Sequence, residues 1–128
     1  METTTKTEQI REVVKLLRSE KNLSLNTETV KELMEKMEDE CDFYLTIDGE
    51  ELRFIAEDSI REIAQEEIWS MVEECYLTTG KEGLPWWIAI DQDKTVQNCI
   101  DADGYGHHFS GYDGNEYETG DWYIFRTN

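Results

Sequence analysis

The chain has 128 residues, with 30 acidic against 12 basic side chains and a formal net charge of −18. This length is enough for one domain with a substantial hydrophobic core. The charge excludes direct binding of DNA or RNA, which needs Lys and Arg against phosphates, and it disfavours anionic membranes for the same reason. It favours a strongly basic protein partner.

The acidic side chains are concentrated after residue 40. Residues 1–40 hold ten acids and seven bases, whereas residues 41–128 hold twenty acids and five bases. This difference predicts a helical hairpin module over 1–40 and an acidic α+β domain over 41–128. The first residues have no apolar stretch of the kind found in signal peptides. Three widely spaced cysteines, an odd number, fit reduced thiols in a cytoplasm.

Two amphipathic helices are expected in residues 1–40. Apolar residues at helical spacing predict a helix over 5–19, with Thr5 and Glu8 as a capping box, and a second helix after the polar break 19–27 that runs to about Met37. The simplest arrangement packs this hairpin on a sheet. A dimerisation arm is the alternative, so a homodimer stays open.

A β-hairpin is predicted over residues 42–56. Asp48-Gly49 is a typical two-residue turn, and it pairs Leu45 with Leu52 and Phe43 with Phe54 on one face. Tyr44–Arg53 and Thr46–Glu51 then fall on the other face, and a shift of one residue would destroy this match.

A long helix over 59–77 and a short helix over 91–100 are expected next. Ser59 with Glu62 resembles a capping box, and Asp91 can cap the shorter helix. Between them, 78–85 reads as a loop, and 86–90 as a short strand or the lead-in to a helix. A β-meander over 101–128 should finish the chain, with turns at Asp113-Gly114 and 119–121 and a central strand over 122–125. The predicted fold is therefore α+β, with an antiparallel sheet of about four strands.

Few residues are candidates for catalysis or metal binding, and their spacing does not suit either role. His107 and His108 are adjacent, so on a strand they would point to opposite faces, and no second pair of ligands is spaced for zinc. The glycine-rich stretch 101–112 lacks the calcium ligands required at its fifth and twelfth positions. No nucleophile elbow or phosphate-binding loop is present. We expect neither enzymatic activity nor a metal or other cofactor; the rival interpretation is a metal-dependent enzyme that uses the His107-His108 region.

Tyrosines among glycines and acids form another candidate surface. Most of the aromatic side chains should lie in the core, but Tyr105 and Tyr112 are expected to be exposed. Exposed tyrosines ringed by carboxylates are typical of protein-binding surfaces.

Residues 90–128 resemble the C-terminal part of small acidic proteins of phages and mobile elements, namely antirestriction proteins of the ArdA kind and anti-CRISPR proteins. The shared features are a short helix from Ile90-Asp91, an Asp103-Gly104-Tyr105 turn, and a closing aromatic strand that ends in Arg126. The resemblance implies a non-enzymatic inhibitor that acts in the cytoplasm of a host bacterial cell. It would bind a basic nuclease or CRISPR effector as a DNA mimic.

Under this interpretation, the partner-binding residues are two groups of carboxylates that replace phosphates. The alternative is a small phage accessory or assembly protein that binds through its aromatic surface or its N-terminal hairpin, without mimicry. The first group of carboxylates is Glu62, Glu66, Glu67, Glu73 and Glu74, and the second is Asp101, Asp103, Asp113, Glu116, Glu118 and Asp121.

Overall fold

The computed structural model describes residues 5–77 and 89–128 and confirms an α+β fold with a four-stranded antiparallel sheet. No helix in these two ranges combines the length and apolar character that a membrane crossing needs. The elements, in chain order, are α1 (Lys6–Ser19), α2 (Thr27–Asp39), β1 (Asp42–Ile47), β2 (Glu50–Ala56), α3 (Glu57–Val72), the π-helical segment η1 (Glu73–Leu77), α4 (Gln92–Phe109), β3 (Tyr117–Glu118) and β4 (Trp122–Arg126).

The sheet has the strand order β1-β2-β4-β3, so β4 is an inner strand as expected. The pairing of β1 with β2 has the predicted register throughout, including Phe43 opposite Phe54 and Leu45 opposite Leu52. Asp48 and Gly49 both have positive φ, 53° and 83°, which is the geometry of a two-residue turn that follows the twist of the strands.

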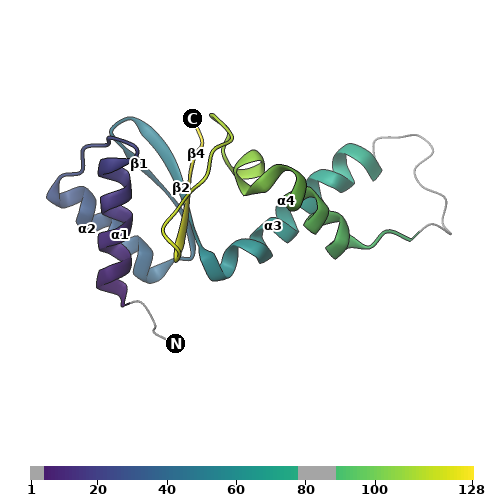
Figure 1. Cartoon of the computed structure of the whole chain (residues 1–128), viewed down its shortest axis with the longest axis horizontal. Helices are drawn as coiled ribbons and strands as arrows, with labels where there is room; N and C mark the ends of the chain where they lie inside the picture. The colour runs from purple at the N-terminus through teal and green to yellow at the C-terminus, as the bar shows by residue number, and fades with distance from the viewer. Residues whose placement is uncertain (1–4, 78–88) are drawn as a thin grey trace.

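Helices cover both faces of the sheet, as Figure 1 shows. On one face, α1 and α2 pack over Leu52 and Phe54 of β2 and Ile124 of β4. On the other, α3 and α4 pack over Ile55 and Phe125. Because alternate residues of a strand point to opposite faces, β2 and β4 each supply apolar side chains to two separate cores.

Side-chain caps fix the start of three helices. Thr5 Oγ1 accepts a hydrogen bond from the Glu8 N–H at 3.2 Å, and Asn26 Oδ1 accepts one from the Thr29 N–H at 2.8 Å. Asp91 Oδ1 accepts from the Lys94 N–H at 3.0 Å, which confirms the predicted cap of α4. Such caps satisfy backbone donors that the first helical turn leaves without partners.

Two predicted helix boundaries are wrong. The Ser59–Glu62 capping box does not form, because the chain passes from β2 directly into α3 at Glu57 and no side chain caps that end. The short helix does not end at Ile100 but continues to Phe109, across a kink at Gly104 with φ 77°.

The kink explains why the stretch after residue 100 does not belong to a meander. Gly104, with φ 77° and ψ 168°, interrupts the helix, but helical structure resumes directly after it and brings Tyr105 and Phe109 onto the core next to Tyr123 and Phe125. Only β3, β4 and the turns before them remain from the expected meander. The expected loop 78–85 lies outside the described residues, and residues 89–90 have no regular secondary structure.

Candidate functional site

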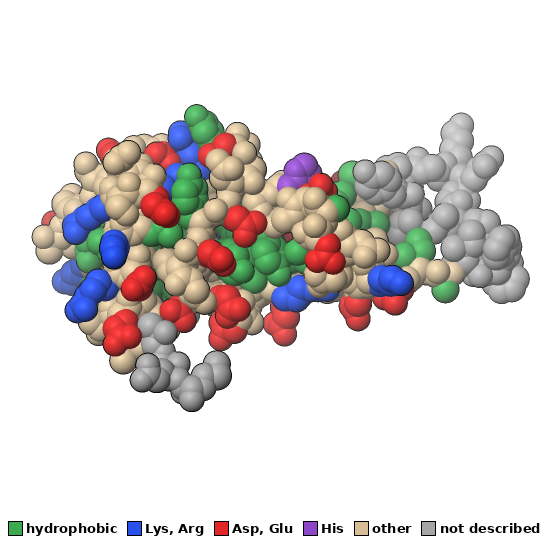
Figure 2. Space-filling model, viewed as in Figure 1, with side chains coloured by type: hydrophobic (Ala, Val, Ile, Leu, Met, Phe, Trp, Pro, Cys, Tyr) green, Lys and Arg blue, Asp and Glu red, His purple; other side chains and the backbone are tan. Residues whose placement is uncertain are grey.

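Charge is distributed unevenly over the molecule. On the face shown in Figure 2, basic side chains gather over α1 and α2, whereas acidic side chains follow the edge formed by α3 and α4. The ion pairs between described residues include the carboxylates of Glu40, Asp42, Glu50 and Glu67. Charge in this protein is therefore largely unneutralised by its own cations.

Glu62 and Glu66 form the clearest part of the first predicted group. They are one helical turn apart on α3, and both side chains are exposed. Residues at this spacing have Cβ atoms about 5–6 Å apart. Neither forms an ion pair with another described residue, so both carboxylates are available to a partner.

Arg61, next to Glu62, is occupied by amides rather than by carboxylates. Its guanidinium donates to Gln65 Oε1 at 2.7 Å and to Gln97 Oε1 of α4 at 3.0 Å. Gln97 Nε2 in turn donates to Asp101 Oδ1 at 2.9 Å. This chain of hydrogen bonds ties Asp101 of α4 to α3, so the exposed Asp101 lies near the row on α3 while its charge stays uncompensated.

Glu67 has a structural role. Arg53, buried in β2, donates to both of its carboxylate oxygens at 3.0 and 2.6 Å, and to both oxygens of Asp42 at 2.8 and 2.7 Å. The Asp42 hydrogen bond is the largest cause of a raised Arg53 pKa; burial opposes it and Glu67 adds to it. The rings of Tyr44 and Phe109 also face this guanidinium, at 5.4 and 5.0 Å.

Glu73 and Glu74 extend the first group into η1, where both side chains are exposed. Sequence reasoning missed two neighbouring acids, Glu57 and Asp58, which are exposed in the first turn of α3. Asp58 stands four residues before Glu62, so helical spacing could have found it. The expected capping box at Ser59 instead placed Asp58 before the helix.

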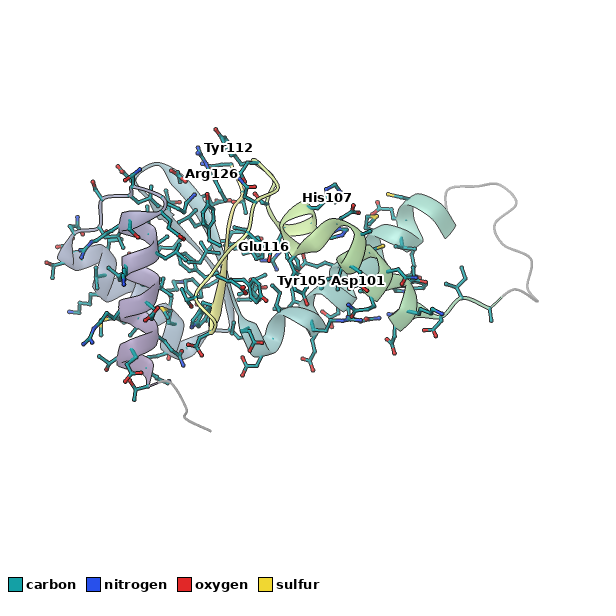
Figure 3. The ribbon with its side chains drawn as sticks, in the orientation of Figure 1. Asp101, Tyr105, His107, Tyr112, Glu116 and Arg126 are labelled. Atoms are coloured by element: carbon teal, nitrogen blue, oxygen red, sulfur yellow. The ribbon has the colours of Figure 1, made fainter. Side chains whose placement is uncertain are left out.

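The second predicted group does not form one surface. Asp101 and Asp103 are exposed on α4, while Asp113 and Glu116 belong to the loop that follows it. Figure 3 shows Asp101 on α4 and Glu116 beside the sheet, with Tyr112 and Arg126 together at the far end of that loop.

Asp113 and Glu116 hold the loop 110–116 in place. Asp113 Oδ1 accepts from Ser110 Oγ and from the Asn115 N–H, both at 3.0 Å, and Glu116 Oε1 accepts from the Gly106 N–H at 3.2 Å. Burial tends to raise the Asp113 pKa, but the hydrogen bonds from Asn115 and Ser110 outweigh it, so the pKa is lowered.

Glu118 and Asp121 are tied to the sheet. Glu118 lies opposite Tyr123 in the pairing of β3 with β4 and accepts a hydrogen bond from it. Burial, followed by this contact, raises the pKa of Tyr123 to about 12. The Asp121 carbonyl accepts from the Glu57 N–H at 2.8 Å and joins β4 to the start of α3.

The two tyrosines expected on the surface differ in environment. Tyr112 is 57% exposed, and the Arg126 guanidinium carbon lies 3.7 Å from the centre of the Tyr112 ring. Tyr105 is packed against Phe109 and Tyr123, and burial raises its pKa. The expectation of an exposed Tyr105 was wrong because its stretch is helical rather than a glycine-rich turn.

His107 and His108 lie on the last turn of α4, not on a strand. Their rings are 5.2 Å apart, and His108 borders a cavity of about 660 Å³ with Cys99 and Asp103. Burial, then the neighbouring His107, lowers the His108 pKa. Within the described residues, no three His, Cys, Asp or Glu side chains are grouped closely enough to hold a metal ion.

No protein-family model matches the chain, and no curated protein or solved structure is significantly similar to it. The function is therefore argued from the exposed carboxylates of α3 and α4.

Proposed function

We propose that this protein inhibits a nucleic-acid-binding host defence protein, a restriction or CRISPR nuclease, by presenting carboxylates in place of DNA phosphates. The observation that carries the proposal is the exposed row of Glu62 and Glu66 on α3, with Asp101 and Asp103 on the adjoining helix α4. None of the four forms an ion pair with a described residue. We name this set the α3–α4 carboxylates.

Spacing supports a phosphate-like role. Duplex DNA carries one negative charge per roughly 1.7 Å of axis, counted over both strands. Carboxylates one helical turn apart are separated by about 5–6 Å at Cβ, which is of the order of the gap between neighbouring phosphates on one strand. Two packed helices that hold such groups can occupy a basic groove shaped for a duplex.

Rigidity supports it as well. The second half of α3 is fixed to β2 by the Arg53–Glu67 ion pair, and α4 is joined to α3 through Arg61 and Gln97. The helices therefore hold the carboxylates without a partner present. Bringing these charges together is unfavourable in the free protein, and Lys and Arg of a partner would relieve that repulsion.

A panel of purified restriction and CRISPR nucleases provides the test. Each enzyme is assayed for DNA cleavage with and without the protein, and binding to any inhibited enzyme is measured at low and high salt. We expect inhibition of at least one enzyme, competition by duplex DNA, and binding that weakens steeply as salt rises.

A charge-reversed variant with matched controls makes the test specific. Glu62→Lys, Glu66→Lys and Asp101→Lys together should abolish inhibition. The same number of reversals on α2, Glu28→Lys, Glu32→Lys and Glu35→Lys, gives the same net charge and should leave inhibition intact. Binding that duplex DNA does not compete, or that survives the α3–α4 reversals, would reject mimicry and favour attachment through another surface.

A further inference from the structure

The N-terminal hairpin carries an apolar groove on its outer side. The groove lies between α1 and α2 and has a volume of about 730 Å³, with Ile10 and Val14 on one wall and Val30 and Met34 on the other. Met34 is 40% exposed, and it is one of few large apolar side chains that described residues leave in solvent. Val14 and Val30 also pack against the core over the sheet but are only partly buried there, so part of their apolar surface stays open in the groove.

The border of the groove is cationic. Arg11, Lys15 and Arg18 of α1 line it, and none of the described carboxylates does. The chain as a whole has 30 acids and 12 bases, so it is strongly negative. The border of this groove, with three cations, has the opposite sign of charge. Figure 2 shows this gathering of basic side chains over α1 and α2.

The cations on this border form no ion pairs within the described part of the chain. Arg11 and Lys15 form none there. Arg18 donates from Nη2 to the Leu25 carbonyl at 3.0 Å, which fixes its side chain without neutralising its charge. The groove therefore offers positive charge next to exposed apolar surface.

We infer that this groove binds an acidic amphipathic helix of another protein. Helices dock in such grooves through apolar side chains at i, i+3, i+4 and i+7. Here those side chains would cover Val14, Val30 and Met34, while carboxylates beside them would reach Arg11 and Lys15. The site is separate from the α3–α4 carboxylates, because the sheet lies between the two helix layers.

A second copy of this chain is a poorer occupant. A symmetric groove-to-groove dimer would bring the same three cations against one another, which is unfavourable. The acidic outer face of α3 has the complementary charge but no apolar anchor, since the exposed large apolar residues of the described chain are Met34, Tyr44, Ile90 and Tyr112.

A pair of labelled peptides tests the inference with the full-length protein. Each has about 18 residues, enough for a stable helix, with leucines at i, i+3, i+4 and i+7; one carries Glu at the flanking positions and the other Lys. Fluorescence anisotropy should show that binding of the Glu peptide depends on residues of the groove. The Lys peptide, which the α3–α4 carboxylates attract, should bind without that dependence.

Three single variants locate the binding site. Met34→Glu, at an exposed position, should weaken binding of the Glu peptide about tenfold or more. Lys15→Glu should weaken it at low salt and much less at high salt. Lys94→Glu, an equal charge change on α4, should leave it unchanged. Circular dichroism confirms folding of each variant, and NMR shift changes should be confined to α1 and α2.

Several outcomes would overturn the inference. Equal binding of the Glu peptide by the Lys15→Glu and Lys94→Glu variants would remove the role of the cationic border. Unchanged binding by Met34→Glu would remove the groove itself. Concentration-dependent self-association that Met34→Glu abolishes, measured by light scattering, would assign the groove to a second copy.

Discussion

Arg53 joins the sheet to the layer of α3 and α4 through its charge. It is buried in β2, yet its guanidinium reaches Asp42 of β1 and Glu67 of α3. A buried cation is costly unless it is paired and hydrogen-bonded. The two carboxylates meet that requirement and, in doing so, fix the position of α3 against the hairpin.

Replacing this arginine should destabilise the protein. Arg53→Leu removes all four charge-assisted hydrogen bonds, and we expect the free energy of unfolding to fall by about 1–3 kcal/mol. The value is moderate because Asp42 and Glu67 remain in reach of water and do not become fully buried charges. Urea denaturation measures the change.

Glu67→Gln is the matched control for the Arg53→Leu variant. It keeps the shape of the side chain and removes one charge from its more exposed partner, so its effect on the urea midpoint should be smaller. An Arg53→Leu variant as stable as the unchanged protein would show that packing alone can position α3.

At the scale of elements, the close approach of α4 to the loop 110–116 depends on Gly106. A Cβ at this position would lie 2.2 Å from the Gly114 carbonyl oxygen, a backbone atom. Gly106→Ala should therefore lower the free energy of unfolding by about 1–3 kcal/mol, because the loop must move away and lose the Glu116 hydrogen bond. Thermal unfolding measures the loss.

Asn98→Ala is the comparison for Gly106→Ala. It lies on the exposed side of the same helix, where alanine favours helix formation. The two substitutions should have opposite signs. An equally tolerated Gly106→Ala would mean that the loop can adjust without cost.

The elements differ in how well the sequence predicts them. The hairpin β1–β2 follows from the Asp48-Gly49 turn and alternating apolar residues, which are local signals. The extent of α4 does not, because glycines at 104 and 106 locally favour a turn. Gly104 does take a non-helical conformation, but the chain returns to a helix after it, where Tyr105 and Phe109 pack on the core.

The candidate site is predictable to a similar degree. Helical spacing correctly groups Glu62 with Glu66 on one exposed face. It cannot show that Glu67 is paired, because Arg53 lies 14 residues away on a strand. Nor can it separate Asp113 and Glu116, which order a loop, from acids that face solvent freely.

The whole molecule carries a formal charge of −18 that its own ion pairs do not neutralise. Raising sodium chloride should therefore stabilise the free protein, since the screening length falls from about 10 Å at 0.1 M to about 3 Å at 1 M. We expect the thermal midpoint to rise by about 3–6 °C. Differential scanning fluorimetry across a salt series measures this.

A variant with fewer charges provides the control for the salt series. Glu62→Gln with Glu66→Gln should raise the midpoint at low salt and flatten its dependence on salt. A midpoint that falls as salt is added would show that attractive pairs such as Arg53–Asp42 outweigh repulsion across the molecule.

The use of β2 and β4 by two cores constrains how this protein can change. A substitution of Leu52 or Phe54 must fit the packing against α1 and α2, whereas a substitution of the neighbouring Ile55 must fit the packing against α3 and α4. Glu62 and Glu66 are exposed and belong to neither core. Substitutions on the exposed side of α3 should therefore cost little stability, whereas those in the inner strands β2 and β4 should cost more.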